Sequence, residues 1–146
     1  MASDRGPRRI EILMVDDDLA DIEFTRDVLA EHRIANRMTV LTDGNSAWHY
    51  LRRDPPFDGA VRPDLLLLDL NLPGIDGLTL LDLVRADAEL RDLKVAVLTT
   101  APVDESILRR RGVPAHCFLL KPVDFDRLVQ VVRQVDGFHL QVERPT

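Results

Sequence analysis

The sequence predicts an α/β domain built on a parallel sheet with right-handed crossovers. Five short apolar runs alternate with five amphipathic stretches, which is the order expected when strands and helices follow one another. The apolar runs are nearly continuous, and one of them is four leucines in a row at 65–68, as in strands that are buried on both faces. The chain has 146 residues, of which 45% are hydrophobic, and that is enough for one domain with its own core.

The first part of the chain supplies two strand–helix units. Ile10–Val15 is apolar apart from one glutamate and predicts a buried strand. Leu19–Glu31 has apolar residues near helical spacing, and Asp18 can cap its start. A second short strand is expected at Met38–Leu41, and a second helix at Ser46–Arg53.

The second part continues the alternation after a loop. Residues 54–63 hold three prolines and a glycine, so they predict an irregular connection. The leucine run Leu65–Leu68 is the third strand, ending at Asp69, and Gly77–Ala86 is the third helix. The remaining expected elements are strands at Val95–Thr99 and Cys117–Leu120 and helices at Asp104–Arg111 and Asp124–Val135.

Composition excludes several classes of function. Acidic residues outnumber basic ones by 25 to 19, and the net charge of −6 disfavours direct contact with nucleic acid. No apolar run approaches the roughly 20 residues that span a bilayer, so we expect no membrane association. The start of the chain is polar, and the single cysteine, Cys117, cannot form an internal disulfide. Together these features predict a cytoplasmic protein.

Functional side chains follow the predicted strands. Asp16 and Asp17 come after the first strand, and Asp69 ends the third. Thr99 ends the fourth strand, and Lys121 follows the fifth. The carboxyl ends of parallel strands share one edge of the sheet, where such folds bind ligands. We therefore expect these five side chains to form one site.

The charges of this site predict a cation and a reaction. Three carboxylates and one ammonium leave an excess of negative charge, which a divalent cation would balance. Hard oxygen ligands suit Mg²⁺, with Mn²⁺ as a substitute. A carboxylate needs no general base to act as a nucleophile, and Asp69, at the tip of an apolar strand, is the best-placed candidate. With Lys121 and Thr99 beside it, the chemistry that fits is phosphoryl transfer to Asp69.

Four separate motifs resemble the receiver domain of two-component response regulators. They are Val15-Asp16-Asp17-Asp18, the run from Leu68 to Gly77 (LDLNLPGIDG), Leu98-Thr99 and Lys121-Pro122. The resemblance covers about residues 9–136. It implies the flavodoxin-like (βα)5 fold, a doubly wound parallel sheet with strand order 2-1-3-4-5.

The resemblance also implies a role for each matched residue. Asp69 would accept a phosphoryl group from the phosphohistidine of a sensor histidine kinase. Such a protein is a phosphoacceptor and not an enzyme, beyond its own phosphotransfer and dephosphorylation. The other implied roles are metal binding by Asp16, Asp17, Asp69 and the backbone carbonyl of Asn71, switching by Thr99 and Phe118, phosphate binding by Lys121, and a cis peptide bond between Lys121 and Pro122.

The finer likeness is to single-domain regulators that work with bacterial phytochrome kinases, which would make such a kinase the partner.

We expect a tail at 1–8, the receiver domain at 9–136 and an extension at 137–146. In the extension, Phe138, Leu140 and Val142 alternate with polar residues, as in a half-buried strand. We interpret it as an arm that forms a homodimer; the alternative is that it lies along its own domain.

Other interpretations compete with these. The triple aspartate at 16–18 also fits a solvated loop with a helix cap, Thr100 competes with Thr99, and Phe118 fits an ordinary core position. A phosphatase of the haloacid-dehalogenase type would need an aspartate at Asn71. A flavin carrier would need a Ser/Thr-rich loop where this chain has three aspartates. A degenerate receiver would lack the key residues that are present here.

Overall fold

The computed structural model describes residues 9–31, 33, 36–70, 72, 74–99, 110, 118–121, 126, 127, 129 and 130. Strands and helices alternate within these residues, as the sequence predicts. They are β1 (Ile10–Val15), α1 (Leu19–Glu31), β2 (Asn36–Leu41), α2 (Gly44–Arg52), β3 (Leu65–Asp69), α3 (Gly77–Ala86), β4 (Lys94–Thr99) and β5 (Phe118–Leu120).

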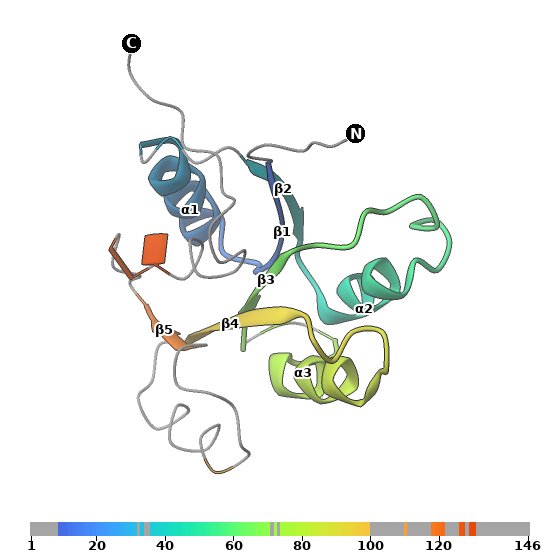
Figure 1. Ribbon diagram of the computed structural model, residues 1–146. Helices are drawn as coiled ribbons and strands as arrows, with labels where there is room; N and C mark the ends of the chain where they lie inside the picture. The colour runs from blue at the N-terminus through green and yellow to red at the C-terminus, as the bar shows by residue number, and fades with distance from the viewer. Residues whose placement is uncertain are drawn as a thin grey trace.

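The strands form one parallel sheet in the order β2-β1-β3-β4-β5, which confirms the predicted topology. Helix α1 covers one face of the sheet, and α2 and α3 cover the other (Figure 1). This is the doubly wound arrangement, in which helices cover both faces of a parallel sheet and the change of face falls where the strand order reverses.

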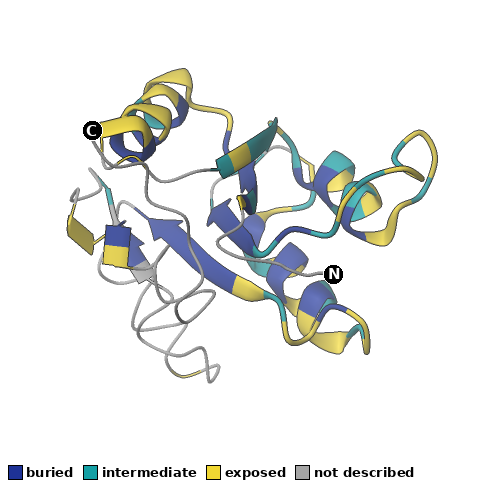
Figure 2. Ribbon diagram, turned by 45° about the horizontal axis from the view of Figure 1, so that its top comes forward, coloured by how far each residue is buried: buried dark blue, intermediate teal, exposed yellow. Residues whose placement is uncertain are grey.

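Each central strand buries side chains on both faces. Leu66 and Leu68 of β3 pack in the layer under α2 and α3, whereas Leu65 and Leu67 pack in the layer under α1. Figure 2 shows the strands as mostly buried and the helices as buried on one side only. The period of two along a strand therefore explains why β3 is a continuous run of leucines.

Three elements begin earlier than the sequence predicts. β2 begins at Asn36 rather than Met38, because polar side chains are tolerated in this edge strand, which is only partly buried. β4 begins at Lys94, whose side chain is exposed. α2 begins at Gly44, because Asp43 is its N-cap and accepts a 2.7 Å hydrogen bond from the backbone N–H of Ser46.

The fourth and fifth expected helices, at 104–111 and 124–135, lie largely outside the described residues. Of these two segments, the described residues 110, 126, 127, 129 and 130 are helical. Cys117 and the extension at 137–146 also lie outside the described residues. In the part of the chain that the structure describes, no helix is both long enough and apolar enough to cross a membrane.

Candidate functional site

The register of the sheet brings the predicted acidic residues together. Val15 of β1 pairs with Leu68 of β3. The next residue on each chain segment, Asp16 after Val15 and Asp69 after Leu68, therefore lies at the same end of the sheet. Carboxylate oxygens of Asp16, Asp17 and Asp69 lie within 4.8 Å of one another. Asp16 and Asp69 are buried and Asp17 is exposed, so the cluster opens to solvent on the Asp17 side.

Lys121 enters the same cluster from β5. Its backbone N–H donates a 2.7 Å hydrogen bond to the carbonyl of Thr99, which fixes it beside the end of β4. Its Nζ lies 3.3 Å from Oδ2 of Asp16 and 3.3 Å from Oδ2 of Asp69. Thr99 is itself buried and ends β4, one strand away from Asp69. The predicted site residues from four strands thus share one edge of the sheet.

Burial dominates the electrostatics of Asp16. The pKa of its carboxyl rises from the ordinary 3.8 to about 7, mainly because burial disfavours the charged form. The hydrogen bond from the backbone of Asp18 works against this rise, and the charge of Asp69 adds to it. A positive charge close to this carboxyl would favour its ionised form.

The pKa of Lys121 is also raised, but for a different reason. Burial by itself lowers the pKa of its ammonium, but a hydrogen bond to Asp21 and the charges of Asp16 and Asp69 more than offset it, so the pKa lies above its ordinary value. The ammonium is therefore charged at any pH at which the protein would work.

Backbone contacts hold the end of β1 in shape. The N–H of Asp18 donates a 2.8 Å hydrogen bond to Oδ1 of Asp16, and Oδ1 of Asp18 accepts one of 2.8 Å from the N–H of Ala20. Asp18 thus caps α1 as the sequence predicts. Its own N–H gives one oxygen of Asp16 a backbone partner.

A close backbone approach holds the end of β3. A Cβ on Gly77 would lie 2.6 Å from the carbonyl oxygen of Asp69 and 2.6 Å from Cα of Leu70. The N–H of Gly77 donates a 3.1 Å hydrogen bond to the carbonyl of Leu70. The first turn of α3 therefore packs directly on the strand end that carries Asp69, and only glycine fits there.

The donor set fits a hard divalent cation. Three carboxylates converge, two of them buried, and no sulfur or imidazole takes part in the group. Several other predicted positions lie outside the described residues: Asn71, Thr100, Pro122 with its expected cis bond, and the arm residues Phe138, Leu140 and Val142. Phe118 is described only as a backbone position of β5.

Sequence reasoning missed a fourth carboxylate. Asp21 is not among the site residues that the sequence predicts, yet its Oδ2 lies 2.5 Å from Nζ of Lys121. Asp21 is the third residue of α1, one turn from the strand end that carries Asp16 and Asp17. That spacing is the signal in the sequence from which its presence at the site could have been predicted.

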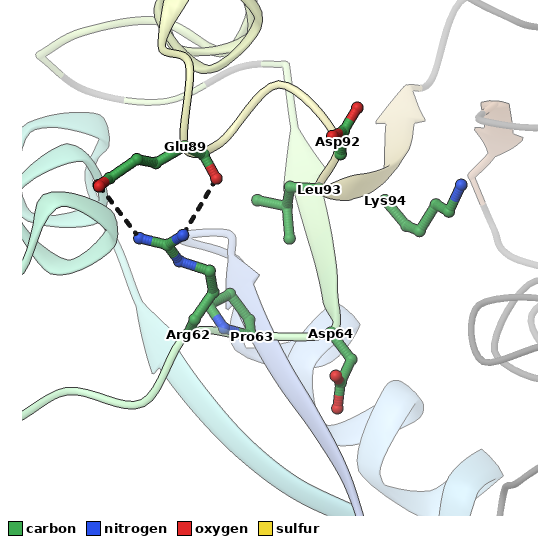
Figure 3. Close-up of a pocket in the computed structure, with 7 residues that line it drawn as sticks. All are labelled: Arg62, Pro63, Asp64, Glu89, Asp92, Leu93 and Lys94. Carbon is green, nitrogen blue, oxygen red and sulfur yellow. Dashed lines mark hydrogen bonds and ion pairs between the residues drawn. The ribbon is translucent and has the colours of Figure 1, made fainter.

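A hollow lies at the end of the sheet where β3 and β4 begin, opposite the strand ends that carry the acidic cluster (Figure 3). It is lined in part by Asp64 and Lys94, and Arg62 crosses it to bind Glu89 through the backbone carbonyl at 3.0 Å and a carboxylate oxygen at 3.7 Å. These contacts anchor the long loop before β3. The strand ends that carry Asp16 and Asp69 lie at the other edge.

The fold and this acidic site together define a receiver domain, and comparison with protein families agrees. The model of the response regulator receiver domain matches residues 12–133. Because the match covers most of the chain, the protein belongs to the response regulator receiver family. The predicted resemblance is confirmed.

Several of the proteins that this chain resembles can be named individually. The response regulator Rcp1 of Synechocystis sp. is 30% identical over 141 residues, which are 97% of this chain and 95% of Rcp1. A solved structure of Rcp1 is a Mn²⁺-bound form, with a TM-score of 0.73 over 94% of this chain and 99% of that chain, at 30% identity. The bacteriophytochrome response regulator RtBRR has a TM-score of 0.82 at 30% identity, covering 95% of this chain and 85% of its own. The phosphorylated cyanobacterial phytochrome response regulator RcpA has a TM-score of 0.74 at 32% identity, covering 90% and 94%.

Proposed function

We propose that this receiver domain accepts a phosphoryl group on Asp69 from the phosphohistidine of a sensor histidine kinase. The observation that carries the proposal is the convergence of Asp69 with Asp16, Asp17 and Lys121 at the strand ends. The structure of a phosphorylated relative, RcpA, adds support. On this proposal the protein is a phosphoacceptor whose only chemistry is its own phosphorylation and dephosphorylation.

Asp69, Lys121 and Thr99 have different roles in the transfer. A carboxylate oxygen of Asp69 attacks phosphorus, the P–O bond forms, and the P–N bond breaks with its electron pair remaining on the histidine nitrogen. Phosphoryl transfer needs mainly positioning and neutralised charge. The ammonium of Lys121, already 3.3 Å from Asp69, would bind a phosphoryl oxygen, and the hydroxyl of Thr99 would bind another.

Mg²⁺, or Mn²⁺ in its place, would be held by Asp16, Asp17, Asp69 and the backbone carbonyl of Asn71. When bound it supplies positive charge against the phosphoryl oxygens. The Mn²⁺-bound structure of Rcp1 supports this assignment. Asp16, whose pKa is raised by burial, would be in its charged form beside the cation.

Phosphorylation would then change the surface of the domain. The new charge draws in Thr99 and Lys121, Phe118 changes rotamer, and a pre-existing equilibrium between two conformations shifts. We place the receiver at 9–136 in the cytoplasm, acting without direct contact with nucleic acid or membrane. The arm at Phe138, Leu140 and Val142 joins two copies; a chain ending at Val135 that dimerises at unchanged concentration would contradict this role.

Phosphotransfer to the Asp69→Asn variant tests the assignment. A kinase carrying labelled phosphohistidine should transfer its label to the wild type with Mg²⁺ and leave Asp69→Asn unlabelled. The matched control is Asp58→Asn, which removes an exposed aspartate from the loop before β3 and should be labelled at the wild-type rate. Labelling of Asp69→Asn at an unchanged rate would refute the assignment.

The names of the relatives suggest which kinase to use in this phosphotransfer experiment. RtBRR and RcpA are named as phytochrome response regulators, so we propose a bacterial phytochrome kinase as the partner. Transfer that depends on red light, with a phytochrome kinase of the same cell, is the expected result. Failure with that kinase and success with another would leave the phosphoacceptor role standing and remove the phytochrome assignment.

A further inference from the structure

Lys121 is shared among three carboxylates, and the nearest of them is not one of the proposed metal ligands. Its Nζ lies 2.5 Å from Oδ2 of Asp21, against 3.3 Å from Asp16 and 3.3 Å from Asp69. Oδ2 of Asp21 is shielded from solvent, although its side chain as a whole is 26% exposed. Lys121 is thus drawn toward the α1 side of the site.

The start of α1 leaves Asp21 free for this contact. An acidic residue three positions after an N-cap commonly reaches back to the backbone N–H of that cap. Here the N–H of Asp18 is already donated to Oδ1 of Asp16 at 2.8 Å. The carboxylate of Asp21 points instead at Lys121, so its role extends beyond a favourable charge in the first turn of the helix.

The geometry points to Asp21 as a positioning residue that holds the Lys121 ammonium partly away from Asp16 and Asp69. This inference rests on the proposed function. In the free domain the contact between Asp21 and Lys121 leaves the oxygens of Asp16 and Asp69 more available to a divalent cation. When Asp69 carries a phosphoryl group, the same contact weakens the binding of Lys121 to that group, because Asp21 and the phosphoryl oxygens compete for one ammonium.

Two opposite effects of Asp21→Asn follow. Without the charge of Asp21, Lys121 pairs fully with Asp16 and Asp69, so Mg²⁺ binding should weaken, on the order of three- to tenfold. At saturating Mg²⁺, binding of beryllofluoride, an analogue of a carboxyl-bound phosphoryl group, should tighten by a similar factor. A structural defect in α1 would weaken both.

The experiment measures both affinities by calorimetry for the wild type, Asp21→Asn, Asp21→Glu and Glu23→Gln. Glu23→Gln is the matched control, since it removes the same charge from an exposed position of the same helix. Asp21→Glu restores the charge and should return both affinities toward the wild-type values. Thermal unfolding shows that each variant is folded.

The outcomes separate this inference from the proposed function. Opposite shifts in Asp21→Asn, absent from Glu23→Gln and reversed in Asp21→Glu, support it. Shifts of the same sign, or shifts equal to those of Glu23→Gln, overturn it while leaving the phosphoacceptor role intact. If the wild type binds Mg²⁺ but no beryllofluoride, the proposed function fails. In that case weaker Mg²⁺ binding by Asp21→Asn, absent from Glu23→Gln, still supports the positioning of Lys121 by Asp21.

Discussion

The ammonium of Lys121 donates a 3.3 Å hydrogen bond to Oδ2 of Asp16, a residue 105 positions earlier in the chain. In the sheet, β3 and β4 lie between the strands that these two residues follow. The lysine side chain therefore reaches across the ends of two strands to a carboxylate that has no contact with solvent. The ammonium of Lys121 and the buried carboxylate of Asp16 therefore stabilise each other's charged forms. A substitution that removes one of them changes the electrostatic environment of the other.

Removing the ammonium should destabilise the metal-free protein and favour metal binding. Lys121→Ala leaves the buried carboxylate of Asp16 without its cation, and the expected loss is about 1–3 kcal/mol of unfolding free energy. Because Lys121 also competes with a divalent cation for Asp16 and Asp69, Mg²⁺ should bind the variant at least as tightly as the wild type. Urea unfolding without metal and Mg²⁺ titration by calorimetry measure the two effects.

The chain provides its own control for this variant. Lys94 is the other of its two lysines and lies exposed at the start of β4, at the opposite edge of the sheet. Lys94→Ala should change stability by no more than about 0.5 kcal/mol. Weaker Mg²⁺ binding by Lys121→Ala, or equal stability of the two variants, would show that the ammonium does not neutralise the site.

The raised pKa of Asp16 predicts how stability depends on pH. Between about pH 4 and pH 7 the folded protein holds a proton on Asp16 that the unfolded chain has released. The folded state then binds more protons, so this group's contribution to stability falls as pH rises through that range, by at most about 1.4 kcal/mol per pH unit. Below pH 4 the contribution is fully present, and above pH 7 it is lost.

Metal binding should follow the opposite course. Mg²⁺ needs the ionised carboxylate, so its affinity rises with pH up to about 7 and then levels off. Urea unfolding of the metal-free wild type and of Asp16→Asn, at several pH values from 4.5 to 8, isolates the contribution of this group. A difference between the two proteins that stays constant with pH would contradict the raised pKa.

The residues that the sequence predicted well are those whose environment is set by the topology. Leu65–Leu68 could be assigned because a strand buried on both faces has no polar side to confuse the pattern. Asp16 and Asp69 could be brought together because parallel strands end at one edge. The start of β2 at Asn36 was not predicted, because an edge strand tolerates polar residues. The contact of Asp21 with Lys121 was not predicted either, because it depends on where a helical side chain points and on which carboxylate a shared lysine prefers.

The packing of α3 on the end of β3 should not tolerate a side chain at Gly77. In Gly77→Ala the new methyl group meets the backbone of Asp69 and Leu70 at 2.6 Å, and backbone cannot move aside cheaply. The expected cost is about 1–3 kcal/mol, with slower phosphorylation because Asp69 is displaced. Gly59→Ala is the control, since a Cβ there meets nothing within 4 Å. Equal melting temperatures for the two variants would show that α3 adjusts freely.

The loop between β3 and α3 is tied to the start of α2, and this tie can be broken by one substitution. The N–H of Ile75 donates a 2.9 Å hydrogen bond to Oδ1 of Asn45. That oxygen lies 2.5 Å from where a Cβ on Gly74 would stand, and Gly74 has a φ of +76°, so the loop follows this path only with glycine there. Asn45→Ala removes the acceptor while leaving the backbone of α2 unchanged.

The expected result of Asn45→Ala is local. Global stability should fall by about 0.5–1 kcal/mol, because the bond is exposed to solvent and water replaces the lost acceptor. The amide of Ile75 should exchange its hydrogen severalfold faster, whereas amides within β3 keep their protection. Asn45→Asp retains an acceptor oxygen and should exchange like the wild type. An unchanged rate at Ile75 in Asn45→Ala would mean that the loop keeps its path without this hydrogen bond, so that the glycine and the packing of Gly44 against Ile75 hold it instead.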